Sequence, residues 1–444
     1  MSRESAPTQR PTEQALLCGL LLEDQAEEFA GPLTEAAGLV EAAGSEVVGE
    51  RILQRRARPV PSTLLGSGKV LEVKAEIERL SPDLVVVDND LSPAQVRNLE
   101  KIWCKRVVDR SELIMDIFSR RAQTRQARLQ VELAQTQYLM PRLRRMWTHL
   151  ERMEGAIGTR GPGETQLETD RRLIKKRITD LRRELEVIEQ RKQRQVRSRA
   201  EEFTIGLVGY TNAGKSSLLN RLTGSTEMAA DMLFATLDTR TRRWELADGR
   251  TVLLSDTVGF LGRLPHHLVA SFQATLEEAL EVDLLLHVID AADPDATTHL
   301  EAVDGVLRTA ARGRRDEILA WNKIDALEGQ LPPDLLASIE DRESVRCSVH
   351  TGEGLDELEA MVVRRLDRRS ALVEIHIPFH EGASLAAIRR VARILEENHD
   401  AVDGTRLRVW VGERELGNFE RACGPDVTVR VLEPAQETYA PRDR

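Results

Sequence analysis

Residues 203–217 read FTIGLVGYTNAGKSS, and this stretch decides the fold of the segment around it. An apolar run that is typical of a buried strand leads directly into G-x-x-x-x-G-K-S, and a helical pattern follows. In such a loop the glycines let backbone N–H groups close around phosphate oxygens, and the helix N-terminus adds its positive dipole end. The stretch therefore predicts a P-loop, the phosphate-binding turn between a strand and a helix.

Two side chains of this loop have expected roles in holding a nucleotide. We expect Lys215 to bridge the β- and γ-phosphates and Ser216 to bind Mg²⁺ through its hydroxyl. The residues expected to line the phosphates are Gly209, Tyr210, Thr211, Asn212, Ala213, Gly214, Lys215 and Ser216.

Strands and helices alternate over residues 200–370 around this loop. Nearly continuous apolar strands that are separated by helical stretches indicate a mainly parallel, doubly wound sheet with both faces covered. The strand candidates are 203–208, 242–246, 251–255, 283–289, 317–322 and 344–348. We therefore expect an α/β fold that contains a P-loop domain.

A D-x-x-G motif follows one of these strands. Asp256 is placed to reach the Mg²⁺ shell and Gly259 to present its N–H to the γ-phosphate, with Thr257 and Val258 between them. The next residue is Phe260, where many nucleotide switches carry a glutamine that orients the attacking water. A phenyl ring cannot do this, so we expect slow basal hydrolysis that a partner, a backbone contact or a cation accelerates.

A threonine between the P-loop and D-x-x-G is needed to complete the Mg²⁺ shell when the γ-phosphate is present. Thr236 is our choice, with Thr239 and Thr241 as competitors. The expected nucleotide-contacting segment is Phe234, Ala235, Thr236, Leu237 and Asp238.

The nucleotide base is predicted from the strand end NKID. The Asp325 carboxylate can accept hydrogen bonds from guanine N1–H and the 2-amino group, whereas adenine would leave it unpaired, at about 1–3 kcal/mol. A backbone N–H from the later S-V-H stretch is expected to reach guanine O6. The residues assigned to the base are Asn322, Lys323, Ile324, Asp325, Ser348, Val349 and His350. The ordered motifs together favour GTP over ATP.

Composition indicates which class of protein this is and in which cellular compartment it works. The chain has 444 residues, of which 41% are hydrophobic and 31% charged, and it is long enough for about three domains. No apolar run approaches the roughly 18 residues of a membrane helix. The four cysteines stand singly, without a C-x-x-C pair, as is typical of a reducing cytosol. We expect a cytoplasmic monomer, and a peripheral association with a membrane stays compatible with this.

Charge is distributed unevenly along the chain. Residues 120–200 hold 21 Lys or Arg against 10 Asp or Glu, a net of +11, so the rest carries −21 of the total of −10. Two amphipathic seams in this segment flank GAIGTRGPG at 155–163, which predicts an antiparallel helical hairpin with a glycine-rich tip. Arg160, in a tip free of acids, is the candidate RNA contact. A solvated coiled-coil face is the alternative, because charge runs often mean no more than that.

These patterns divide the chain into four expected units. They are an N-terminal α/β domain at 1–110, the basic hairpin at 111–199, the P-loop domain at 200–370 and a small C-terminal α/β domain at 371–444. In the first unit the expected strands are 15–22, 46–51 and 83–87, and the expected helices are 69–80 and 93–103. In the last unit the expected strands are 373–377, 406–411 and 427–432, and the expected helices are 383–397 and 413–422.

One longer motif carries a family resemblance. Residues 158–172 read GTRGPGETQLETDRR, and with GYTNAGKS, FATLD, DTVGF and NKID they closely resemble the HflX family of bacterial GTPases over essentially the whole chain. The resemblance implies a Ras-like, translation-factor-class GTPase that converts GTP and water to GDP and phosphate. It also implies binding to the large (50S) ribosomal subunit and its rRNA, dissociation of stalled or idle 70S ribosomes in the GTP state, and stimulation of hydrolysis by the ribosome.

Two details and two alternatives accompany the resemblance. Many relatives continue FATLD with Pro-Thr where this chain has Thr239-Arg240, which removes no needed chemical group. Asn212 resembles the loop asparagine of potassium-stimulated GTPases, so K⁺ in the position of an arginine finger is a candidate cofactor. The alternatives are a GTPase that assembles ribosomes, and a GTP-gated RNA-binding module with negligible turnover, which Phe260 motivates.

Overall fold

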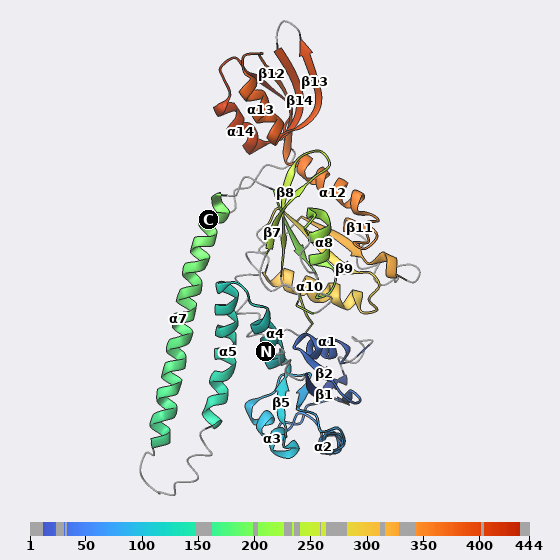
Figure 1. Cartoon of the computed structure of the whole chain (residues 1–444), viewed down its shortest axis with the longest axis vertical. Coiled ribbons are helices and arrows are strands. Elements are labelled where there is room, and N and C mark those ends of the chain that lie inside the picture. Colours follow the sequence, from blue (N-terminus) through green and yellow to red (C-terminus); the bar gives the residue numbers. More distant parts are fainter. Residues whose placement is uncertain are drawn as a thin grey trace, which may run out of the picture.

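The computed structural model describes residues 12–23, 31, 33–146, 162–198, 203–225, 233–234, 240–257, 259–262, 282–310, 316–327, 342–400 and 404–435. These residues form three sheets and a pair of long helices along one axis (Figure 1). None of the helices in the described ranges combines the length and the apolar character that crossing a bilayer requires.

The N-terminal sheet is parallel throughout and is covered on both faces. Its strand order is β2-β1-β4-β5, and β3 also pairs with β1. Neighbouring residues of β1 point to opposite faces, so Leu16 packs with helices α2 and α3 while Leu17 packs with α1 and α4. The elements are β1 (Glu13–Leu22), α1 (Thr34–Ala42), β2 (Ser45–Val47), β3 (Ile52–Arg56), α2 (Ser67–Leu80), β4 (Leu84–Val87), α3 (Pro93–Trp103), β5 (Arg106–Asp109) and α4 (Arg110–Arg121).

The strand expected over 46–51 is wrong in its second half, because β2 ends at Val47 and the next strand, β3, starts only at Ile52. β2 and β3 pair with successive parts of β1, and Gly49 between them has φ +74°, a left-handed conformation that interrupts an extended chain.

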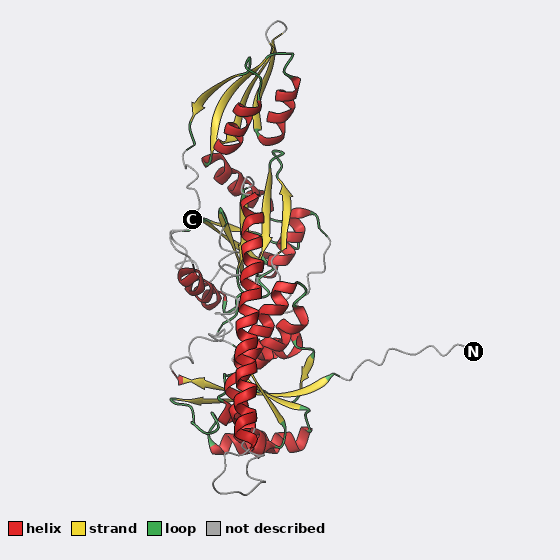
Figure 2. Cartoon of the chain, turned by 90° about the vertical axis from the view of Figure 1, so that its left-hand side faces the viewer, coloured by secondary structure: helices red, strands yellow, loops and turns green. Residues whose placement is uncertain are grey.

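Two long helices, α5 (Arg125–Met146) and α7 (Pro162–Ser198), lie antiparallel and side by side (Figures 1 and 2). Their contact is an apolar seam that Leu129 and Leu133 share with Ile178 and Leu181. The expected tip loop falls largely outside the described residues, as does Arg160. α7 begins at Pro162, because the first turn of a helix has no use for the N–H that proline lacks.

The third group of elements forms a six-stranded sheet with the order β11-β10-β9-β6-β8-β7. All its pairs are parallel except β7 with β8, so the expected mainly parallel α/β fold is confirmed. The elements are β6 (Thr204–Val208), α8 (Lys215–Thr223), β7 (Arg240–Glu245), β8 (Thr251–Asp256), β9 (Leu284–Asp290), α10 (Ala296–Ala310), β10 (Glu317–Asn322), the 3₁₀ turn η2 (Ile324–Ala326), β11 (Ser344–Arg346) and α12 (Leu355–Arg368).

The C-terminal sheet is antiparallel, with the order β13-β14-β12-β15, and Figure 2 shows its two helices on one face. The helix expected over 383–397 is wrong in its second half, since the helix ends at Val391 and a strand follows. Pairing of that strand with β14 satisfies its backbone and packs Ile394 against the core, which outweighs the helical pattern. The elements are β12 (Ser370–Ile377), α13 (Gly382–Val391), β13 (Arg393–Asp400), β14 (Gly404–Gly412), α14 (Glu413–Ala422) and β15 (Thr428–Glu433).

Candidate nucleotide-binding site

The P-loop joins β6 to α8 at the carboxyl edge of the parallel sheet. Gly214 has φ +97°, and a Cβ there would come within 2.2 Å of Asn322 Nδ2, so only glycine fits. α8 begins at Lys215, which places its free N–H groups at the end of the loop. The backbone is therefore arranged to hold an anion at this helix N-terminus.

Lys215 is buried beneath the loop that it is expected to serve. Its Nζ donates to Gly209 O at 3.0 Å and to Tyr210 O at 2.6 Å. Burial lowers the pKa of Lys215 to about 8, against a smaller raising effect from Asp256. The ammonium group thus lies at the phosphate side of the loop, in a place where an anion would stabilise its charge.

Ser216 and Asp256 meet, as a shared Mg²⁺ site requires. Ser216 Oγ donates to Asp256 Oδ2 at 2.7 Å. Asp256 is 1% exposed, and within the described part of the chain its Oδ1 is buried without a hydrogen-bond partner. A buried carboxylate oxygen without a donor is a suitable ligand for a hard cation, so these residues fit Mg²⁺.

The segment that follows Asp256 is attached to the P-loop by its backbone. Thr211 N donates to Phe260 O at 2.7 Å, and Phe260 N donates to Gly209 O at 3.1 Å. The Phe260 ring is 2% exposed and packs between β6, β9 and α10. Its side chain therefore belongs to the core of this sheet and does not face the phosphates. Thr257 is also buried, with its hydroxyl donating to Leu207 O, and Val258 lies outside the described residues.

The expected base-binding loops are brought together by Asn322. Its Nδ2 donates to Ala213 O at 2.9 Å, and its Oδ1 accepts from Val349 N at 3.1 Å. Asp325 Oδ1 accepts from Ser348 Oγ at 2.5 Å, and this hydrogen bond is the main cause that lowers the pKa of Asp325. An ionised acceptor is thus held at the edge of the sheet where the base would lie.

The other residues assigned to the base lie next to Asn322 and Ser348 in the chain. Lys323 has φ +64° and its Nζ forms an ion pair with Asp290 at 2.6 Å, while Ile324 packs partly buried near Trp321. His350 is exposed at the end of the S-V-H stretch.

The expected threonine segment is described only at its start. Phe234 is buried and makes an edge-to-face contact with Phe118 of α4, with ring centroids 4.7 Å apart. Ala235, Thr236, Leu237 and Asp238 lie outside the described residues.

Residues of the N-terminal sheet also reach this site, which no local motif indicated. The Tyr210 hydroxyl donates to Glu35 of α1, and Arg110 of α4 donates to Gly262 O at 2.7 Å. The partners are 175 and 152 residues apart in the chain, so only the tertiary structure could reveal them.

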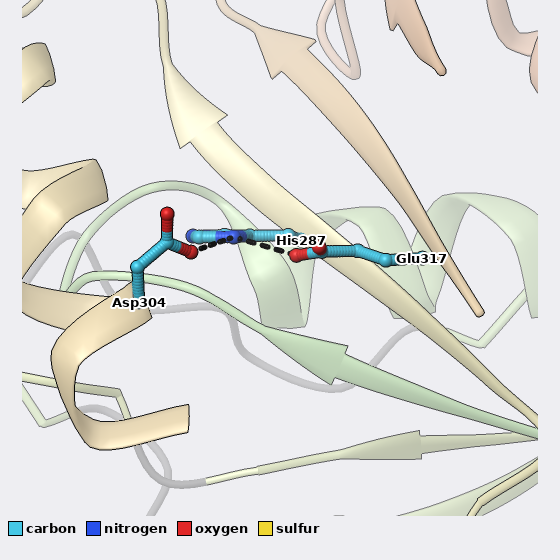
Figure 3. Close-up of side chains that lie close together, drawn as sticks. All are labelled: His287, Asp304 and Glu317. Atoms are coloured by element: carbon cyan, nitrogen blue, oxygen red, sulfur yellow. Dashed lines mark hydrogen bonds and ion pairs between the residues drawn. The ribbon is translucent and has the colours of Figure 1, made fainter. Parts of the chain in front are cut away.

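A second cluster of ionisable side chains lies on the same sheet. His287 Nδ1 is 3.1 Å from Glu317 Oε1 and 4.0 Å from Asp304 Oδ1 (Figure 3). Arg342 donates to Asp304 at 2.8 Å and to Glu317 at 2.6 Å. Because the guanidinium already pairs with both carboxylates, the cluster is an ion-pair network between β9, α10 and β10, not a metal centre.

Three family models match successive parts of the chain. A GTP-binding GTPase N-terminal model matches residues 31–119, a GTP-binding GTPase middle-region model matches 121–199, and a 50S ribosome-binding GTPase model matches 204–323.

Curated relatives extend the similarity over nearly the whole length. The chain is 46% identical over 394 residues to GTPase HflX of Escherichia coli (strain K12), covering 88% of this chain and 91% of the relative. It is 44% identical over 393 residues to GTPase HflX of Magnetococcus marinus, covering 87% and 90%. Among solved structures, a GTP-binding protein from Sulfolobus solfataricus in complex with GDP is 24% identical, with a TM-score of 0.43 over 80% of this chain and 98% of that one.

Proposed function

The chain belongs to the HflX family of GTPases, and on that premise we propose that it binds the large ribosomal subunit and dissociates stalled or idle 70S ribosomes in its GTP state. GTP binding and GTP hydrolysis follow from the family itself. The ribosomal partner is supported by the 50S ribosome-binding GTPase model that matches residues 204–323. The observation that carries the proposal further is the basic helical hairpin of this otherwise acidic chain.

The exposed face of α7 suits an RNA backbone. Its exposed cations are Arg171, Arg172, Lys175, Lys176, Arg177, Arg182, Arg183 and Arg191. Of these, Arg177 is paired with Glu132 of the neighbouring helix α5. Phosphate contacts from such a row are strong, independent of sequence and sensitive to salt. Arg160, which comes between the two helices in the chain, is a further proposed RNA contact.

We assign the hydrolytic machinery to residues of the P-loop and its neighbours. Lys215 holds the β- and γ-phosphates and Gly259 N–H contacts the γ-phosphate. Ser216 and Thr236 are the proposed Mg²⁺ ligands, and Asp256, which accepts from Ser216, would complete the surroundings of the ion. The bound ion would supply charge stabilisation for the transferred phosphoryl group. Because the Phe260 ring is packed in the core, water positioning falls to another group, and the ribosome is the proposed source of acceleration.

The base-binding assignment can be made more specific. Asp325 is the proposed acceptor for guanine. The N–H groups of Val349 and Thr351 already donate to Asn322 Oδ1 and Ser348 Oγ, at 3.1 and 3.0 Å. We therefore assign the contact with guanine O6 to the N–H of His350.

The remaining assignments concern organisation. We propose the units 1–110, 111–199, 200–370 and 371–444 as the functional domains, acting in a cytoplasmic monomer. K⁺ at Asn212 is a proposed additional cofactor: this side chain is exposed and its φ of +62° places it at the turn of the P-loop.

Ribosome-stimulated hydrolysis is the decisive test. GTP turnover should rise when purified 50S subunits are added, and the rise should weaken with salt. A Lys175→Ala/Lys176→Ala variant and Arg160→Ala should each reduce it, while Arg97→Ala, an exposed arginine on α3, should not.

A second measurement separates splitting from assembly. Sucrose gradients of 70S ribosomes with the protein and a non-hydrolysable GTP analogue should show separated subunits. Intact 70S particles would favour the assembly alternative, and a turnover that 50S subunits leave unchanged would contradict the proposal.

A further inference from the structure

A buried polar network joins the N-terminal sheet to the segment that follows D-x-x-G. Tyr210 of the P-loop donates its hydroxyl proton to Glu35 and accepts from Gly262 N at 2.6 Å. Arg110 donates to Glu35, to Gly262 O at 2.7 Å and to Asp88 at 2.5 Å. The N–H and the C=O of Gly262 are therefore both hydrogen-bonded, the first to Tyr210 and the second to Arg110. Glu35 accepts a hydrogen bond from each of these two side chains.

Tyr210 and Arg110 both keep the protons with which they donate in this network. Burial, and then the proximity of Glu35, raise the pKa of Tyr210, so its hydroxyl remains a donor. Burial disfavours the charge on Arg110, but Asp88 and Glu35 together raise the pKa of Arg110 above its usual value. The guanidinium therefore stays charged between its two carboxylates.

Apolar contacts also join this region to the N-terminal sheet. Leu261, two residues after Gly259, and Phe234, two residues before Thr236, are buried in the core that α1 and α4 form on the N-terminal sheet. Figure 1 shows this sheet directly beneath the P-loop domain, with α1 toward it. Gly259 is thus followed closely in the chain by a residue that is anchored in the N-terminal core, and Phe234 is a second anchor of this kind.

The held position brings Gly259 close to the P-loop. A Cβ at Gly259 would come within 2.9 Å of Thr211 Cγ2 and 3.1 Å of Lys215 Nζ. A phosphate oxygen that is hydrogen-bonded to both Lys215 Nζ and Gly259 N–H needs about 2.7–3.2 Å to each of the two nitrogens. The backbone of Gly259 thus lies directly against the P-loop beside Lys215 Nζ, where the γ-phosphate is expected to enter. The α- and β-phosphates of GDP make no demand on this place.

We propose that Glu35 is a positioning residue that holds residues 259–262 against the P-loop through Tyr210 and Arg110, so that γ-phosphate binding and docking of the N-terminal sheet oppose each other. The coupling is reciprocal: docking weakens GTP relative to GDP, and GTP weakens docking by the same factor. The proposal rests on nucleotide binding alone and requires no ribosome.

The test compares two affinities in the full-length protein without ribosomes. For Glu35→Ala, the ratio of the Kd for a non-hydrolysable GTP analogue to the Kd for GDP should fall by about fivefold or more. Glu41→Ala removes an exposed acid from the same helix and should leave the ratio unchanged. Glu35→Gln keeps the size and one acceptor oxygen, so its ratio should be intermediate.

Scattering gives an independent readout of docking. In small-angle X-ray scattering, the GTP analogue should enlarge the wild-type radius of gyration relative to GDP, and Glu35→Ala should be enlarged with both. A role limited to stability would change the unfolding temperature and not the affinity ratio. The proposal is wrong if folded Glu35→Ala changes the Kd for the GTP analogue and the Kd for GDP by the same factor. If that variant does not fold, the same comparison is made with Glu35→Gln.

Discussion

Nucleotide affinity should fall as pH rises through the pKa of Lys215. In the nucleotide-free protein, burial lowers the pKa of this group from its ordinary value of 10.5 to about 8. Bound phosphates favour the ammonium form and raise that pKa again, so binding is coupled to protonation of Lys215. The free protein is mostly protonated at about pH 7 and about one-tenth protonated at about pH 9, so GDP should bind about tenfold more weakly at the higher pH, or about 1.4 kcal/mol.

Titration of a fluorescent GDP analogue between about pH 6.5 and 9 at constant ionic strength measures this effect. Lys215→Arg is the matched control, because an arginine stays protonated throughout and any titration of the guanine base would affect both proteins equally. The stability of the nucleotide-free protein depends on pH in the opposite direction to its nucleotide affinity. Between about pH 8 and 10.5 the unfolded chain binds more protons at this lysine, so its contribution to the free energy of unfolding rises with pH. Parallel affinity profiles for wild type and Lys215→Arg would refute the reasoning.

Three other changes test neighbouring parts of the site. Asn322→Ala leaves Ala213 O and Val349 N unpaired, so the free energy of unfolding in a urea titration should fall by about 1–3 kcal/mol, with weaker GDP binding; unchanged values of both would contradict the bridging role. Phe260→Gln places an amide in a core position and should lower the free energy of unfolding by roughly 3 kcal/mol or more without raising basal GTP turnover; a stably folded, faster variant would show that a glutamine here can reach the water. GTP turnover should be higher in KCl than in NaCl, and Asn212→Ala should remove the difference; equal wild-type rates in the two salts would eliminate the K⁺ assignment.

Phe260 illustrates how much of the site a sequence can predict. The D-x-x-G spacing places Phe260 directly after the motif, because that spacing is a property of one turn. The position of its ring depends on packing against β9 and α10, which come later in the chain. The expected helix over 383–397 failed for a similar reason, since the strand that replaces its second half exists only by pairing with β14.

By itself, the sequence determined the P-loop, the parallel α/β sheet around it, the strand end that carries NKID and the pair of long helices. Each depends on periodicity or on spacing within a few residues, where backbone geometry leaves few alternatives. Only the tertiary structure decided that the N-terminal sheet holds Gly262 and Tyr210 through Arg110 and Glu35. These groups are 75 to 175 residues apart, and burial of their charges is stable only because the fold brings all the partners together.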